Sequence, residues 1–197
     1  MDWIKERNYL VSTIDPIHWS LKTGDGVKIS DFVVIEEGCE IGSNTLIGNF
    51  VKLRPNTKIG SNCVIGNFVM SEGWCQIGHR AIIMHFSGIG YGCIIEDDVW
   101  IGPHFQGSNT KQIAHQRPWM KLKPEDRSPY IIRKGARIGI KVTIMPGIEI
   151  GTDAFVHAGS LITKDVPSRA IMRGFPAKQI GGVPEGECLY TSNGKRK

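Results

Sequence analysis

Histidine takes up and releases protons near neutral pH, so the positions of the six histidines are the first guide to possible chemistry. His115 lies within residues 107–131, a stretch dense in ring and charged side chains that includes Lys111 and Arg117. His104 lies just before that stretch, and His85 lies further upstream. A general base must come within hydrogen-bond reach of the proton it removes. The sequence therefore offers several candidate bases, each of which could instead be a surface or packing histidine.

The cysteines and the charge pattern argue against several other chemistries. The five cysteines form no CxxC pair, so we expect neither a disulfide framework nor a bound metal. The formal net charge is +5, but basic and acidic residues are interleaved, which argues against a nucleic-acid groove and suits small polyanionic ligands. No leader-like start and no apolar run of about 18 residues occurs, so we expect a cytoplasmic protein that does not cross a membrane.

The elements that must position these residues follow from a repeat of six. Isoleucine recurs at every sixth residue through 29–106 with few exceptions, and the frame resumes over 132–167. Glycine often follows the isoleucine, and the fifth position of each hexad is small or β-branched; four of the five cysteines fall there. A period of six fits neither a helix nor a simple strand alternation.

We interpret each hexad as a short strand followed by a turn. Three such units close a triangular coil, and the coils stack through parallel pairing with isoleucine inside. The glycine is expected to allow unusual turn dihedrals. Nineteen hexads then predict an all-β solenoid of about six coils. The strands of a β-sandwich would not keep a six-residue frame over 29–106.

Three segments depart from the repeat. Residues 1–22 are expected to cap the first coil, or alternatively to contact substrate, and 23–182 to form the solenoid. Residues 107–131 are expected to form an extruded loop that helps to build a site, with subunit packing alone as the alternative. Residues 183–197 are expected to form a C-terminal tail.

The repeat resembles that of the hexapeptide-repeat acyltransferases over about residues 29–182. This resemblance implies a left-handed parallel β-helix. The run ITKDVP at 162–167 and the run GFPAK at 174–178 are similar to the ending of the members that use CoA, although Phe175 stands where they usually have Asn. By that similarity acetyl-CoA is the co-substrate, and its expected contacts are Lys141, Ala158, Gly159, Lys164 and Lys178.

The run IEDDVWIGP at 95–103 resembles N-acetyltransferases that act on nucleotide-linked amino sugars. Xenobiotic acetyltransferases of this fold resemble the chain in placing a reactive histidine in the loop. These resemblances imply His115 as the base, with His104 as the alternative, and Asn109 as a residue that orients the base or holds the sugar. His85, Lys111 and Arg117 are expected to contact the substrate.

Several alternatives stay open. The acceptor could instead be a saccharide hydroxyl or a xenobiotic. His79 and His115 are 36 residues apart, which suggests a γ-type carbonic anhydrase with a metal, and a non-catalytic scaffold is a further possibility. The resemblance also implies a homotrimer, with each site between neighbouring subunits.

Overall fold

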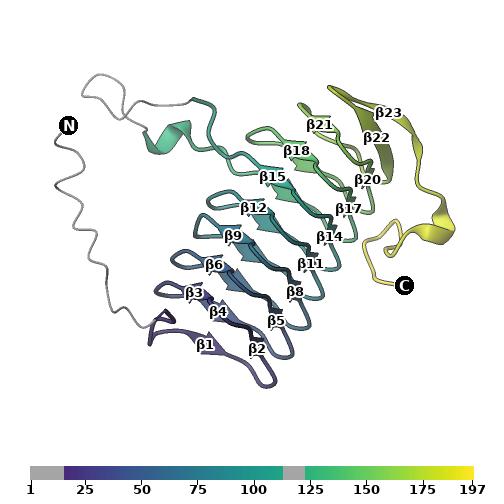
Figure 1. The fold of residues 1–197 in the computed structure, drawn as a ribbon. Coiled ribbons are helices and arrows are strands. Elements are labelled where there is room, and N and C mark those ends of the chain that lie inside the picture. Colours follow the sequence, from purple (N-terminus) through teal and green to yellow (C-terminus); the bar gives the residue numbers. More distant parts are fainter. Residues whose placement is uncertain (1–15, 113–122) are drawn as a thin grey trace.

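The structure, a computed structural model, describes residues 16–112 and 123–197. Over these residues the chain winds into a three-sided parallel β-solenoid (Figure 1). Each strand pairs in parallel with the strand one coil later, so that Ile41 lies beside Ile59 and Ile59 beside Ile77. This spacing of 18 residues is three hexads per coil, which confirms the predicted all-β solenoid.

The strands form three sheets, one on each side of the prism. The first face contains β1 (Lys22–Thr23), β4 (Glu40–Ile41), β7 (Lys58–Ile59), β10 (Gln76–Ile77), β13 (Ile94–Ile95), β16 (Ile131–Ile132) and β19 (Glu149–Ile150). The second face contains β2 (Lys28–Ile29), β5 (Leu46–Ile47), β8 (Val64–Ile65), β11 (Ile82–Ile83), β14 (Trp100–Ile101), β17 (Arg137–Ile138), β20 (Phe155–Val156), β22 (Ala170–Gly174) and β23 (Ala177–Gly182). The third face contains β3 (Val34–Ile35), β6 (Lys52–Leu53), β9 (Met70–Ser71), β12 (Gly88–Ile89), β15 (Gln106–Gly107), β18 (Thr143–Ile144) and β21 (Leu161–Ile162).

The solenoid has about eight coils, and the prediction of six was too low. On each face, seven strands come from seven successive coils. One further parallel pairing at an end of each face adds the equivalent of one more coil. On the first and third faces this pairing is a bridge, from Val166 to Ile150 and from Ile17 to Ile35, and on the second face it is that of β22 with β20. These end hexads lack the isoleucine–glycine signature that marks the repeat in the sequence.

The core confirms the inward direction of the repeat. The isoleucines that lead the hexads and the small residues at the fifth position are buried almost without exception. The glycines after the isoleucines, however, do not provide the turn dihedrals as expected. A Cβ on Gly42 would lie 2.6 Å from the backbone of the next coil, so glycine is needed there for close approach. The left-handed turn conformation falls two residues later, as at Asn44, where φ is 56°.

Two segments leave the prism. The chain departs after β15 and returns at β16, and the short 3-10 helix η2 (Pro124–Asp126) lies on the projecting part (Figure 1). After β23, the C-terminal segment, which includes the 3-10 helix η3 (Glu185–Glu187), runs back along the outside of the solenoid. No helix in the described part of the chain is long and apolar enough to cross a membrane.

Candidate functional site

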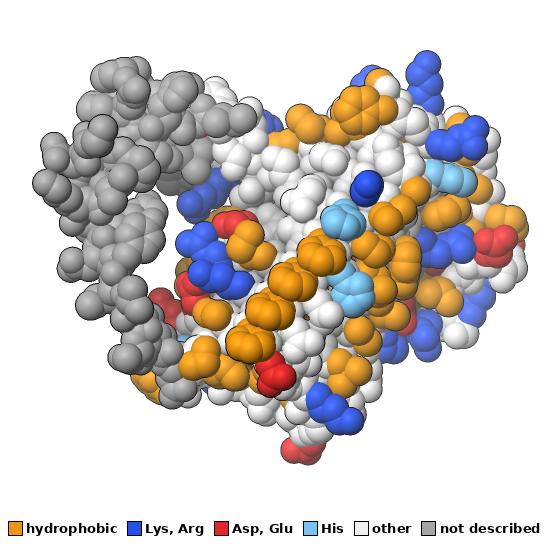
Figure 2. Space-filling model, in the orientation of Figure 1, with side chains coloured by type: hydrophobic (Ala, Val, Ile, Leu, Met, Phe, Trp, Pro, Cys, Tyr) orange, Lys and Arg blue, Asp and Glu red, His pale blue; other side chains and the backbone are white. Residues whose placement is uncertain are grey.

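One corner of the prism carries a ladder of aromatic rings. We call it the phenylalanine corner: it is the turn after each strand of the second face, where Phe32, Phe50, Phe68, Phe86 and His104 occupy the same place in successive coils. Neighbouring ring centroids lie 4.7–5.0 Å apart and the ring planes differ by only 6–9°. All five residues have φ of 58–60°, so the backbone directs every side chain alike. Figure 2 shows the rings as an exposed diagonal band.

The same corner continues into residues that the sequence assigned to the cofactor. The amide of Lys141 donates to the carbonyl of Pro103 at 2.9 Å, and the amide of Gly159 donates to the carbonyl of Ile140 at 2.8 Å. His104, Lys141 and Gly159 therefore stand on three successive coils, with Ala158 beside Gly159. A Cβ on Gly159 would meet no atom within 4 Å, so the space in front of this backbone is open.

His85 lies on the phenylalanine corner as well, but its ring has a structural task. Its Nδ1 accepts the amide of Asn67 at 2.8 Å, just as Oδ1 of Asn67 accepts the amide of Asn49 at 2.9 Å. The carbonyl of His85 accepts the amide of His104 at 2.9 Å. His79 plays the same capping role elsewhere, where its Nδ1 accepts the amide of Ser61 at 3.0 Å. Because Nδ1 is occupied, only Nε2 of His85 could make the predicted contact with a substrate.

Two other predicted residues, Asn109 and Lys164, lie on a different corner, the turn after each strand of the third face. We call this turn the arm corner; it also carries Tyr91. Here the projecting segment is fastened to the prism. Asn109 donates from Nδ2 to the carbonyl of Tyr91 at 3.4 Å, and the guanidinium carbon of Arg127 lies 4.1 Å from the centre of the Tyr91 ring. The amide of Lys111 donates to the carbonyl of Asp126 at 3.1 Å. His115 and Arg117, predicted as base and substrate contact, lie outside the described residues.

The projecting segment between β15 and β16, which we call the arm, is anchored in the core by the contact of Gly107 with Tyr130. Tyr130, which the sequence placed in the extruded loop, is fully buried, and burial raises the pKa of its phenol. Its ring occupies the position that the side chain of a leading isoleucine would fill at residue 107, where the chain has glycine. The Tyr130 hydroxyl accepts the amide of Gly90 at 3.3 Å. The two ends of the insertion are thus locked together by one ring.

The remaining predicted cation lies at the C-terminal end of the solenoid. Lys178 is on β23, opposite Arg173 on β22, and both are exposed. The amide of Gly174 donates to the hydroxyl of Ser160 at 3.2 Å, which fastens this hairpin next to Gly159. The end of the phenylalanine corner is therefore basic.

An anchoring network that the sequence did not reveal surrounds Asp98. Its carboxylate accepts Arg80 at 2.7 Å and Tyr190 at 2.5 Å, and pairs with Arg196 at 3.2 Å. Although burial by itself raises the pKa of Asp98, the bonds from Arg80 and Tyr190 outweigh it and hold the pKa below its ordinary value. Asp153 accepts the amides of residues 189 and 190, both at 3.0 Å. The C-terminal segment is thereby bound to the prism.

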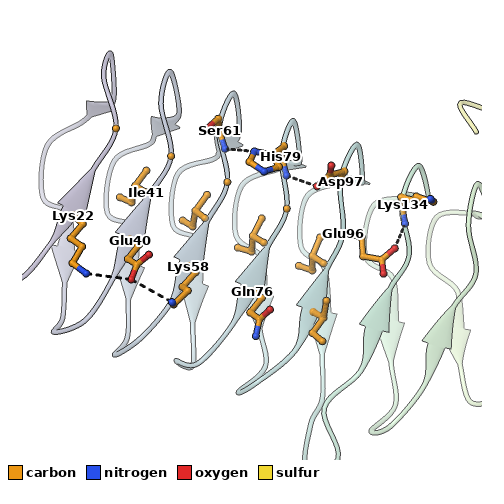
Figure 3. Close-up of a pocket in the computed structure, with 18 of the residues that line it drawn as sticks. Lys22, Glu40, Ile41, Lys58, Ser61, Gln76, His79, Glu96, Asp97 and Lys134 are labelled. Atoms are coloured by element: carbon orange, nitrogen blue, oxygen red, sulfur yellow. Dashed lines mark hydrogen bonds and ion pairs between the residues drawn. The ribbon is translucent and has the colours of Figure 1, made fainter. Parts of the chain in front are cut away.

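A groove of about 870 Å³ runs along the first face (Figure 3). None of the residues predicted as the base, a CoA contact or a substrate contact lines it, although His79 of the carbonic anhydrase alternative and Glu96 and Asp97 of the IEDDVWIGP run do. Three of its charged side chains pair with one another, since the carboxylate of Glu40 lies 3.8 Å from the amine of Lys22 and 3.4 Å from that of Lys58. We therefore regard the phenylalanine corner, and not this groove, as the candidate site. Within the described residues, no three His, Cys, Asp or Glu side chains form a group that could hold a metal ion.

Comparisons with known proteins agree with the repeat. The family model described as "Bacterial transferase hexapeptide (six repeats)" matches residues 21–55, 38–70 and 129–164. Serine acetyltransferase 4 from Arabidopsis thaliana is 53% identical over 66 residues, 34% of this chain and 18% of that protein. The 2,3,4,5-tetrahydropyridine-2,6-dicarboxylate N-acetyltransferase of Staphylococcus aureus is 39% identical over 64 residues, 32% of this chain and 27% of that protein. The chain thus matches about a fifth to a quarter of the length of these relatives.

A solved structure of similar fold is a mutant of AntD, an N-acyltransferase from Bacillus cereus, in complex with dTDP and coenzyme A. It is 21% identical, with a TM-score of 0.50, over 84% of this chain and 85% of that one. A second AntD complex, with dTDP-4-amino-4,6-dideoxyglucose and coenzyme A, gives 19% identity and the same TM-score over 83% and 87%. At this identity the likeness shows the fold alone. The repeat matches cover less than half of the chain, so the comparisons together show hexapeptide repeats like those of bacterial transferases and a shared fold.

Proposed function

We propose that the chain is an acetyl-CoA-dependent acyltransferase, and that it N-acetylates the amino group of a nucleotide-linked amino sugar. The observation that carries this proposal is the order of residues on the phenylalanine corner, where His104, Lys141 and Gly159 follow one another on successive coils. An imidazole that can accept a proton then lies next to a cation and an open backbone. The amine substrate of the AntD complex supports this choice of acceptor.

The chemistry follows from these groups. The neutral amine attacks the thioester carbonyl of acetyl-CoA, so that a C–N bond forms, while the imidazole of His104 accepts the proton that the nitrogen loses. The C–S bond then breaks, and the CoA thiolate leaves and is protonated. Lys141 and Lys178 offer point charges to the CoA phosphates, and the bare backbone at Ala158 and Gly159 admits an extended ligand.

Two variants separate the candidate bases. We expect His104→Ala to lower kcat/KM by roughly 10²–10⁴-fold, the usual contribution of a general base. His115→Ala is the matched comparison, because that residue is the base implied by resemblance. Release of free thiol from acetyl-CoA is measured with dTDP-4-amino-4,6-dideoxyglucose and, in parallel, with hydroxyl-bearing saccharides. Turnover only with the saccharides would replace N-acetylation by O-acetylation, and full activity in both variants would refute His104 and His115 as the base.

We also propose that the working enzyme is a homotrimer. Within one chain, the predicted residues are divided between the phenylalanine corner and the arm corner, so packing of copies side by side would bring the two corners together. The outer side of the second face offers an apolar surface for this contact. Leu46, Val64, Ile82 and Trp100 are in register on it. Figure 2 shows apolar side chains gathered beside the diagonal band.

Light scattering tests the trimer. We expect Ile82→Glu to dissociate it, because a charge would be placed in the apolar contact. Gln76→Glu, at the corresponding place on the first face, should leave it intact. A wild-type monomer would contradict the proposal.

A further inference from the structure

The histidines of the described chain differ in what their ring nitrogens already do. Nδ1 of His79 and Nδ1 of His85 each accept a backbone amide, and Nδ1 of His18 is 2.8 Å from the hydroxyl of Ser20. No hydrogen bond within residues 16–112 and 123–197 involves the ring of His104, which is exposed, or that of His157, which is partly buried. The packing partner of the His104 ring is instead the face of Phe86, 5.0 Å away between centroids and tilted by only 9°.

The position of this imidazole is set by the ladder behind it. His104 takes the place of a fifth ring, with the same backbone conformation as the four phenylalanines. An isolated exposed histidine would rotate among its rotamers. A ring laid flat on Phe86 is confined to one plane, because Phe86 is itself held on its other face by Phe68, at 4.9 Å between centroids.

The stack also determines which part of each ring meets a ligand. Since the faces cover one another, the edges are what the solvent reaches, and about half of Phe50, Phe68 and Phe86 is exposed. Phe50, Phe68 and Phe86, which have a ring on each side, therefore offer no free ring face on which a sugar could stack. For His104 the edge carries the two nitrogens, and stacking through the ring face leaves both without a competing bond from the described chain.

We propose that Phe86 is a positioning residue for His104, with Phe68 as its support, and that this stack fixes the imidazole in the orientation used for proton transfer. This inference rests on the proposed function, in which His104 is the base. The inference gives the exposed aromatic ladder of the phenylalanine corner a function in catalysis. Phe86 itself touches neither the acetyl group nor the acceptor in this account.

The test compares two equivalent substitutions. Phe86→Leu removes the ring that contacts His104, and Phe50→Leu removes an equally exposed ring two coils away that does not. With acetyl-CoA and dTDP-4-amino-4,6-dideoxyglucose as the probe pair, we expect Phe86→Leu to lower kcat by about 10- to 100-fold, in line with the cost of misplacing a catalytic group, with KM for acetyl-CoA unchanged. Phe50→Leu should stay near wild type, and Phe86→Tyr, which keeps the ring face, should restore the rate.

A spectroscopic signature gives a second readout that does not need turnover. The ring protons of His104, assigned by their loss in His104→Ala, should be shifted upfield by the Phe86 ring current in the wild type, in Phe50→Leu and in Phe86→Tyr, and should lose that shift in Phe86→Leu. If the shift is lost but kcat equals that of Phe50→Leu, the positioning role is wrong. If the shift is absent in the wild type, the stack itself is wrong. If His104→Ala retains full kcat, the proposed base fails while the stack can still stand, so the two failures are distinguishable.

Discussion

The pairing of Gly107 with Tyr130 predicts a rescue between two damaging substitutions. Tyr130→Ala removes a fully buried ring that packs edge-on against Phe105, with centroids 6.0 Å apart. Loss of a large buried aromatic side chain costs about 3–5 kcal/mol of unfolding free energy. Gly107→Ile alone would drive its side chain into that ring, and overpacking of a filled core costs about 1–3 kcal/mol or more.

The double variant restores the pattern of the repeat, with isoleucine leading the hexad in register with Ile144 and a small residue at position 130. If the two effects were independent, the double variant would lose about 4–8 kcal/mol. We expect a loss of only about 1–2 kcal/mol instead, because the new isoleucine fills the cavity and the main residual cost is the Gly90 amide that bonded the Tyr130 hydroxyl.

Urea unfolding of the four proteins, followed by circular dichroism, measures this coupling. A difference of about 2–7 kcal/mol between the double variant and the sum of the single ones is the expected result, well above the few tenths of a kcal/mol found for independent sites. Additive losses would refute the view that the ring replaces the missing isoleucine, and would mean that the arm is anchored by other contacts.

Three further predictions follow from the hydrogen-bond ladders and the C-terminal anchor. The pKa of Asp98 in the folded protein lies below its ordinary value. The stability that Asp98 contributes is therefore present above its unfolded-state pKa and is lost as the pH falls through its folded-state pKa. Asp98→Asn should remove this acid-dependent loss of stability in thermal melts taken across acidic pH. His85→Asn should melt close to wild type because Asn can still accept the Asn67 amide, whereas His85→Ala should lose about 1 kcal/mol, and equal melting of the two would contradict the capping role. Asp153→Ala should speed hydrogen exchange at the Tyr190 amide, and unchanged protection would show that the C-terminal segment is held without it.

The repeat made the solenoid predictable because its information is local. Within each hexad the isoleucine marks the residue that faces inward, and this pattern recurs too often to arise by chance. The coils at the two ends were not predicted, because Thr23 and Val166 stand where the repeat has isoleucine. Thr23 and Ile17 nevertheless keep the spacing of six residues. The aromatic ladder was also present in the sequence, since Phe32, Phe50, Phe68 and Phe86 are 18 residues apart. That spacing acquires a meaning only once three hexads are known to make one coil.

The sequence by itself determined the three-sided solenoid, its inward isoleucines and the place where the chain leaves it. Only the tertiary structure decided that Tyr130 belongs to the core and that His104 ends a stack of rings. It also decided that Asp98 holds the C-terminal segment through Tyr190. A period fixes what each residue does within its own turn, because strand and corner geometry repeat every six residues. Contacts between an insertion, a tail and the prism depend on complementary shapes brought together from distant positions, and no local period encodes them.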